Sequence, residues 1–308
     1  MPIIMNLETS ARLKALFAAL VWGGSFVATK AALRDIQPIT LIVLRFAIGI
    51  LILAFAVWRL RVFRIVATRD FILLAFLGFI AIVVHQGLQA FGLLFTTSGN
   101  MAWLVATQPI FTAILAAMVL REIFGAIKIA GLVIAFVGVI LVVTRGALSP
   151  ETLRLPSTFG DLLALASALN WTIFSVISKP ILKRISPTLM MAYVMTIGWL
   201  IVVPVWGIGQ GWNDLAHLTR DGWIAVAFLG IFCSGIAYIF WYDALAHIDA
   251  SQVAAFIYLE PLVTMIVAAI ILSEPITPIT LLGGFTIILG VYLVNRPTRR
   301  AEAIVARD

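Results

Sequence analysis

Two stretches of sequence decide the fold. Residues 250–261 read ASQVAAFIYLEP, and residues 98–109 read SGNMAWLVATQP. At an offset of 152 residues, Gln108-Pro109 aligns with Glu260-Pro261. Each pair places a polar residue and a proline about halfway along a run that is otherwise apolar. We infer that one ancestral unit occurs twice in the chain.

The match between the two halves extends well beyond these stretches. Further aligned pairs are Glu122 with Glu274 and Gly138 with Gly290, and, at an offset of 149, Trp22 with Trp171, Lys30 with Lys179 and Pro38 with Pro187. We therefore expect two repeats, at residues 11–145 and 158–296. The segment between them is the longest predicted connection and holds Pro150 and Pro156.

The composition is that of a membrane protein. The chain of 308 residues is 63% hydrophobic and 11% charged, and its mean hydropathy is +1.12. Soluble proteins carry about 25% charged residues, and a spanning helix needs about 20 apolar ones. We predict an all-α membrane protein with ten transmembrane helices, at residues 13–33, 38–58, 71–91, 99–120, 125–144, 161–182, 188–208, 222–244, 250–272 and 278–294.

The loop charges predict the orientation. With ten spans, 15 of the 21 Lys and Arg residues fall on the side that holds both termini, and five fall on the other side. Cytoplasmic loops carry such an excess, so we expect both termini in the cytoplasm and a multi-pass protein of the inner membrane. Five helices per repeat invert the second repeat. Inverted repeats are typical of transporters, whose substrate site lies near the midplane between the halves.

Other classes of protein fit the sequence less well. A single cysteine, Cys233, excludes an internal disulfide and a cysteine zinc site. The net charge of +7 lies in short loops, which favours cytoplasmic placement over nucleic-acid binding. The cluster Asp243, His247 and Asp249 resembles a solvated loop more than a metal site. No GxxxxGK[ST] or HExxH motif is present. We expect no enzyme, no metal and no cofactor.

Short motifs give a family resemblance. They are Trp22-Gly23, Leu44-Arg45-Phe46, Arg121-Glu122, Trp241-Tyr242, Ala250-Ser251, Leu259-Glu260-Pro261 and Glu274. With these motifs, residues 13–295 resemble the drug/metabolite transporter superfamily, and within it the ten-helix EamA-type transporters. That resemblance implies an inverted-repeat fold with a central cavity, and export of amino acids, other metabolites or drugs. The chain is also similar to the YddG-type amino-acid exporters, which implies that His85, Trp103 and Trp171 line the cavity.

Two charges lie inside predicted spans, where charged residues usually face the protein interior and are functional. Arg45 either acts in transport or ties helix ends together through backbone carbonyls. Glu260 either binds a substrate ammonium group or carries a coupling proton, or else forms a structural ion pair with Arg45 or Lys179. The partner of Glu260 in the first repeat is the neutral Gln108, so a symmetric pair of carboxylates is not available.

Polar and aromatic residues inside other spans complete the predicted substrate site. His85 and Gln89 lie four residues apart, on one helical face. Each either lines the cavity or forms hydrogen bonds between helices. The remaining candidates are Trp22, Trp103, Trp171 and Tyr258, which offer a cavity wall or simple packing, and Asn170, which could hydrogen-bond a substrate.

Glu122 and Glu274 follow the fourth and ninth spans, on opposite sides of the membrane. They are candidates for gate residues, or are solvated helix ends. We predict a secondary transporter that exports amino acids or related small metabolites by alternating access. The alternative is a proton-coupled multidrug exporter of lipophilic cations with Glu260 as the binding charge. Its expected partners are the small-molecule substrate and the lipid bilayer, with no nucleic acid, in a monomer or homodimer.

Overall fold

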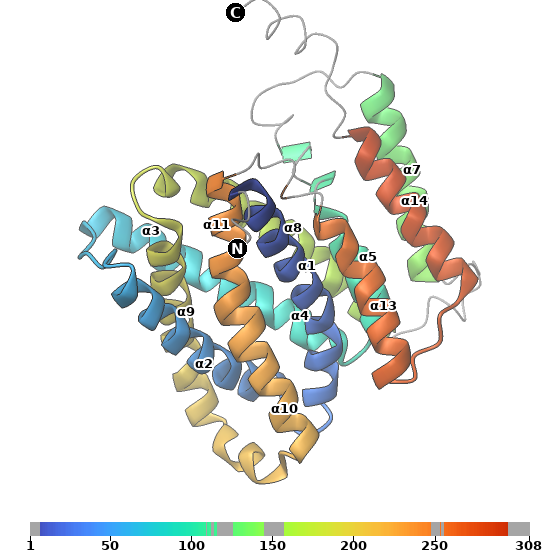
Figure 1. Ribbon diagram of the computed structural model, residues 1–308. Coiled ribbons are helices and arrows are strands. Elements are labelled where there is room, and N and C mark those ends of the chain that lie inside the picture. The colour runs from blue at the N-terminus through green and yellow to red at the C-terminus, as the bar shows by residue number, and fades with distance from the viewer. Residues whose placement is uncertain are drawn as a thin grey trace, which may run out of the picture.

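The computed structural model describes residues 7–108, 110–111, 114–115, 126–144, 157–247, 253 and 256–294, and every regular element in these ranges is helical (Figure 1). The predicted all-α membrane fold is confirmed at that level. Among the described residues, seven helical stretches are long and apolar enough to cross a membrane, and Phe256–Ile271 and Pro278–Leu293 are shorter apolar helices.

The described helices of the first half are α1 (Leu7–Ala32), α2 (Pro38–Arg59), α3 (Thr68–Gly78), η1 (Phe79–His85), α4 (Gln86–Leu93), α5 (Ser98–Val105) and α7 (Ala126–Thr144). Those of the second half are α8 (Ser157–Leu182), α9 (Pro187–Ile208), η2 (Gly211–His217), α10 (Arg220–Phe228), η3 (Leu229–Ile236), α11 (Ala237–His247), η4 (Phe256–Leu259), α13 (Glu260–Ile271) and α14 (Pro278–Val294).

Local sequence explains where several helices begin. Pro38 and Pro187 occupy the first turns of α2 and α9, where the missing N–H costs nothing. At the start of α5, the side chain of Thr97 accepts a hydrogen bond from the Asn100 backbone N–H at 3.1 Å. Thr219 caps α10 in the same way through the Gly222 N–H at 3.2 Å. Such caps satisfy donors that the helix itself cannot.

Contacts between the halves come in matching pairs. Helix α2 packs against η3, while α9 packs against α3 and η1. Glycines allow both approaches, since a Cβ on Gly49 would lie 2.7 Å from the Ser234 Cβ and one on Gly198 would lie 2.5 Å from the Gly78 carbonyl oxygen. Gly49 and Gly198 are 149 residues apart, the offset of the early sequence block. In the same manner α1 packs against α13, and α8 against α5.

Helices α7 and α14 form a close pair at one edge of the bundle (Figure 1). A Cβ on Gly138 would lie 2.7 Å from the Gly283 carbonyl oxygen, and one on Gly290 would lie 2.5 Å from the Ala135 nitrogen. Packing of small residues brings helices together in lipid, where water supplies no hydrophobic drive. These glycines therefore belong to the packing of this pair.

Four interruptions break the long helices in corresponding places. The π-helical segments η1 and η3 sit within the α3–α4 and α10–α11 stretches. Helix α5 ends at Val105, shortly before Gln108, and the 3₁₀ segment η4 leads into α13 at Glu260. Irregular turns inside helices often mark functional positions. All four adjoin the cavity described next.

Candidate functional site

A cavity of about 90 Å³ lies between the two halves. It is large enough for several waters. Its polar wall includes Arg45, His85, Gln86, Gln89, Gln108 and Glu260. Its aromatic wall is formed by Trp22, Phe26, Trp171 and Tyr238. The cavity is thus lined by residues from α1, α2, α4 and α8 and by residues that lie in or next to the four interruptions.

Arg45 is held by residues that the two π segments position. Its side chain is buried, and its Nε donates to the Ser234 Oγ in η3 at 3.1 Å. Its Nη1 donates to the Gln86 Oε1, directly after η1, at 3.2 Å. The guanidinium also lies 5.0 Å from the centre of the Phe46 ring, within cation–π range. Arg45 therefore connects both halves through neutral partners.

Glu260 is the first residue of α13, and its side chain lines the same cavity. Pro261 follows it at the second helical position, where its missing N–H is tolerated. The Glu260 backbone oxygen accepts the Thr264 hydroxyl at 2.8 Å. Its carboxylate forms no hydrogen bond or ion pair with Arg45 or with any other described residue. The predicted structural pair with Arg45 is thus not formed within 4.0 Å here.

His85 and Trp171 form one side of the cavity. Their ring centres are 4.8 Å apart, and Trp171 stacks in turn on Phe174 at 4.8 Å. The Nδ1 of His85 lies 3.2 Å from the Ser167 carbonyl oxygen. A carbonyl only accepts, so this nitrogen carries a proton. Packing and the hydrogen bond together fix the orientation of the imidazole.

Three predicted site residues lie away from this cavity. Trp103 is fully buried, and its Nε1 lies 3.0 Å from the Met265 sulfur. The Nδ2 of Asn170 donates to the Ile80 carbonyl at 3.0 Å, and Tyr258 packs in the hydrophobic cluster that contains Trp103. Glu122 lies outside the described residues. The cavity therefore brings together Arg45, His85, Gln89, Trp171 and Glu260 from the predicted set, with Trp22 beside them.

Among the residues that sequence reasoning missed are Ser234 and Tyr238. Ser234 is completely buried and binds Arg45, and Tyr238 lines the cavity. A signal for Ser234 existed, since a polar residue in an apolar run tends to face a partner. Tyr238 carried no comparable signal, because aromatic residues are frequent throughout its span.

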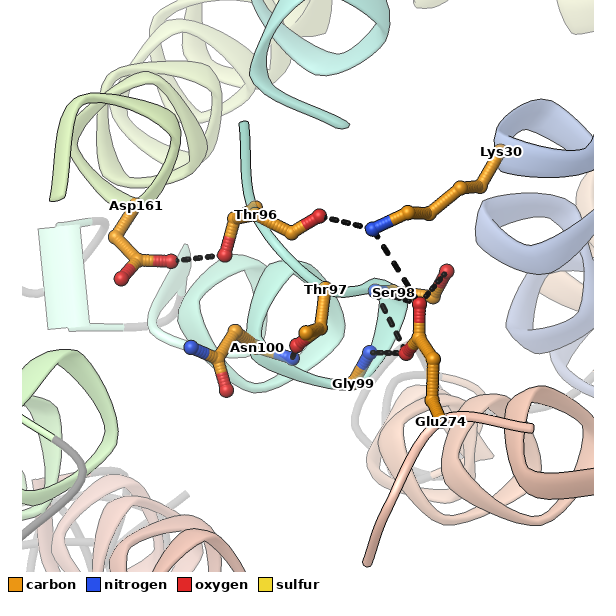
Figure 2. Close-up of polar contacts among 8 residues, drawn as sticks. All are labelled: Lys30, Thr96, Thr97, Ser98, Gly99, Asn100, Asp161 and Glu274. Carbon is orange, nitrogen blue, oxygen red and sulfur yellow. Dashed lines mark hydrogen bonds and ion pairs between the residues drawn. The ribbon is translucent and has the colours of Figure 1, made fainter. Parts of the chain in front are cut away.

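A second polar group lies at one end of the helices, around Glu274 (Figure 2). Its carboxylate accepts the Ser98 N–H at 3.0 and 3.1 Å, the Ser98 hydroxyl at 3.3 Å and the Gly99 N–H at 3.4 Å. It also lies 3.4 Å from the Lys30 Nζ. Ser273, in the left-handed conformation with φ of 58°, turns the chain so that Glu274 follows α13 closely.

The same group reaches α8. Lys30 donates to the Thr96 carbonyl, and the Thr96 hydroxyl donates to Asp161 (Figure 2). The contacts thus join the end of α1, the α4–α5 connection, the start of α8 and the α13–α14 connection. We call this set the clasp, which consists of Lys30, Thr96, Ser98, Gly99, Asp161 and Glu274. The helices that it joins are among those whose other residues line the cavity.

The model of the EamA-like transporter family matches twice, at residues 9–144 and 158–296. Similar proteins include an "Uncharacterized transporter" of Archaeoglobus fulgidus, 29% identical over 90% of this chain and 94% of that one. Another is YyaM of Bacillus subtilis, also named an uncharacterized transporter, 30% identical over 71% of each chain.

One relative has a more specific name. The "Probable terminal-alkyne amino-acid exporter" of Streptantibioticus cattleyicolor is 28% identical over 92% of this chain and 93% of that one. A solved crystal structure has the same fold, with a TM-score of 0.62 and 19% identity over 93% of this chain and 96% of the other. The family model thus matches each half, and together the two matches cover nearly the whole chain. The chain belongs to the EamA-like transporter family and is a multi-pass membrane transporter rather than an enzyme.

Proposed function

We propose that this protein is a secondary transporter that exports amino acids or related small metabolites across the inner membrane. The observation that carries the proposal is the cavity between the halves, which has charged, polar and aromatic walls. Charged side chains at membrane depth usually serve a transport path. Aromatic rings give an amphipathic substrate an apolar surface.

The mechanism that we propose is alternating access by two inverted repeats of five helices. Three observations support it. The contacts between the halves occur in matching pairs, the family model matches each half, and the helix interruptions correspond. Ten spans follow if each interrupted helix crosses once. Both termini are then cytoplasmic, as the excess of Lys and Arg on that side favours.

In this arrangement the clasp closes the outer end of the cavity. Lys30 at the end of α1, Ser98 at the start of α5 and Glu274 after α13 all lie at the outer side of a ten-span topology. Charge-assisted hydrogen bonds of this kind are stronger than neutral ones. By the repeat, Glu122 is the counterpart of Glu274 at the inner side.

The amino-acid class rests on the chemistry of the cavity and on one relative. A positive and a negative side chain line the same space, and the relative from Streptantibioticus cattleyicolor is named a probable exporter of an amino acid. The metabolites that such a cavity accommodates are small, because its volume is below the 300–1,000 Å³ usual for drug-sized ligands.

Transport into proteoliposomes tests the proposal. The purified protein is reconstituted and offered a panel of labelled amino acids and tetraphenylphosphonium, with and without a pH gradient. Saturable movement of amino acids is expected. Acceleration by the gradient indicates proton coupling through Glu260 or His85. Movement of the cation alone overturns the proposal in favour of a multidrug exporter.

A further inference from the structure

The cavity is lined by a basic and an acidic side chain that do not form a pair. Arg45 and Glu260 both line it, and no hydrogen bond or ion pair joins them in the described part of the chain. Oppositely charged groups buried together normally form a pair, because each isolated charge loses the solvation of water. Their separation therefore calls for an explanation.

The structure keeps Arg45 in place without neutralising it. Ser234 and Gln86 accept from Nε and Nη1, and both are uncharged. The Nη2 makes no hydrogen bond to any described residue. A guanidinium stays protonated in proteins and has five donors in a planar fork that matches a carboxylate. Arg45 thus retains an unused donor and an uncompensated positive charge at the cavity wall.

Glu260 likewise has no oppositely charged partner among the described residues. It lies at the junction of η4 and α13, and its side chain lines the cavity. Trp22 and Tyr238, whose rings are 5.3 Å apart, line the same cavity and provide aromatic surface. A ligand cation near Glu260 would find a counter-charge and π faces together.

We propose that the cavity selects zwitterions, binding the carboxylate of an α-amino acid at Arg45 and its ammonium group at Glu260. This inference rests on the proposed function and specifies its substrate class. A ligand with both charges compensates both walls at once. A simple amine leaves Arg45 uncompensated and is repelled by it, and a simple carboxylate meets the same difficulty at Glu260. Selectivity then arises from repulsion of single charges as well as from attraction.

Competition experiments test the pairing directly. Saturable binding of labelled leucine and labelled phenylalanine to the purified protein is measured with unlabelled competitors. For leucine these are 3-methylbutylamine, which lacks the carboxylate, and 4-methylpentanoate, which lacks the amine; for phenylalanine they are phenethylamine and 3-phenylpropionate. We expect each intact amino acid to compete at least about tenfold better than either analogue, since one lost charge contact costs about 1.4 kcal/mol or more.

Two variants assign each charge to its group. Glu260→Gln should weaken amino-acid binding about tenfold or more while the carboxylate analogues bind as well as before or better. Arg45→Gln should have the mirror effect and spare the amines. If Arg45→Gln does not fold, Arg45→Lys keeps the charge but loses the fork, and Ser234→Ala loosens the guanidinium. The control is Glu8→Gln, at an exposed pair with Arg12, which should leave every affinity unchanged.

The outcomes separate this inference from the function beneath it. If the amines or the carboxylates compete as well as the amino acids in the unmodified protein, the zwitterion site is wrong. Amino-acid transport in proteoliposomes would then still support the exporter. The inference is also wrong if the two variants do not change the ranking of the analogues. If neither amino acid binds or moves while tetraphenylphosphonium does, the proposed function fails as well.

Discussion

Trp103 and Trp171 are chemically identical side chains inside predicted spans, yet their surroundings differ. Trp171 lines the cavity between His85 and Phe174. Trp103 is fully buried beside Met265 and Gly284, where a Cβ on the glycine would lie 2.3 Å from the indole. The first therefore belongs to the proposed substrate path, and the second to the packing of α5 against the second half.

Replacing Trp171 should impair transport without loss of the folded protein. We expect Trp171→Ala to lower the transport rate of amino acids in proteoliposomes by about tenfold or more, because the variant loses a large wall of the site. Trp223→Ala removes a half-exposed indole that does not line the cavity and serves as the control. Transport at the normal rate by Trp171→Ala would remove this residue from the site.

Replacing Trp103 should lower stability but leave transport nearly unchanged. Trp103→Ala leaves a void in a fully packed position and should cost on the order of 3 kcal/mol of stability. Thermal unfolding in detergent, followed by the loss of a monodisperse peak, measures that change. Transport per folded molecule should stay near normal. A large loss of transport with unchanged thermal stability would show that Trp103 acts in the path.

The sequence predicts part of the site for a clear physical reason. Arg45, His85 and Glu260 stand out because polar groups in apolar runs turn away from lipid. The direction of Trp103 could not be predicted, since an aromatic side chain is equally suited to a cavity wall and to a packed core. Asn170 likewise bonds a backbone carbonyl of η1, which only the three-dimensional packing could indicate.

The irregular helical segments could not be predicted from the sequence. The spans around η1 and η3 have ordinary apolar sequences, and nothing in them announces a π turn. A π turn rotates all later side chains of the helix, so the faces deduced from a regular helix shift after it. Gln86, the first residue after η1, accepts from Arg45 at 3.2 Å, a contact that the shared face of His85 and Gln89 did not predict.

The paired glycine contacts should be sensitive to added volume. Gly198→Val places atoms where the Gly78 carbonyl and the Ile82 side chain lie within about 2.6 Å of the new Cβ and should cost about 1–3 kcal/mol. Gly87→Ala is the control, since nothing lies within 4 Å of its Cβ. The thermal stability of both variants measures the effect. Equal stability would mean that α3 and α9 can separate at little cost.

The internal repeat in the sequence predicts the arrangement of the whole molecule best. A fixed offset between two halves predicts symmetric contacts, because equivalent segments have equivalent neighbours, and the pairs at Gly49 and Gly198 follow that rule. Its conformational state could not be predicted. The repeat describes both ends of the transporter alike, whereas the contacts of Glu274 with α1 and α5 are known only from the structure.

Weakening the clasp should open the outer end. Glu274→Gln removes the charge from contacts worth about 1.5 kcal/mol, so the open population should rise roughly tenfold. In a Cys233→Ala background, Ser25→Cys places a thiol at the cavity. Its labelling by a membrane-impermeant reagent added to intact cells should accelerate by a similar factor.

Two comparisons make that labelling experiment specific. Lys30→Met should accelerate labelling too, because it removes the cation of the same contact. Glu8→Gln changes a carboxylate outside the clasp and should leave the labelling rate alone. If Glu274→Gln slows labelling or leaves it unchanged, the clasp does not hold the outer end.

The shortness of α5 has a mechanical consequence. With eight residues it is about 12 Å long. The backbone N–H groups of its first residues, Ser98 and Gly99, donate to the Glu274 carboxylate, and its last residue, Val105, lines the cavity. A helix of two turns is too short to bend much, so its two ends move together. We therefore expect a substrate that displaces Val105 to displace Ser98 and Gly99 as well, so that binding in the cavity weakens the contacts of Glu274.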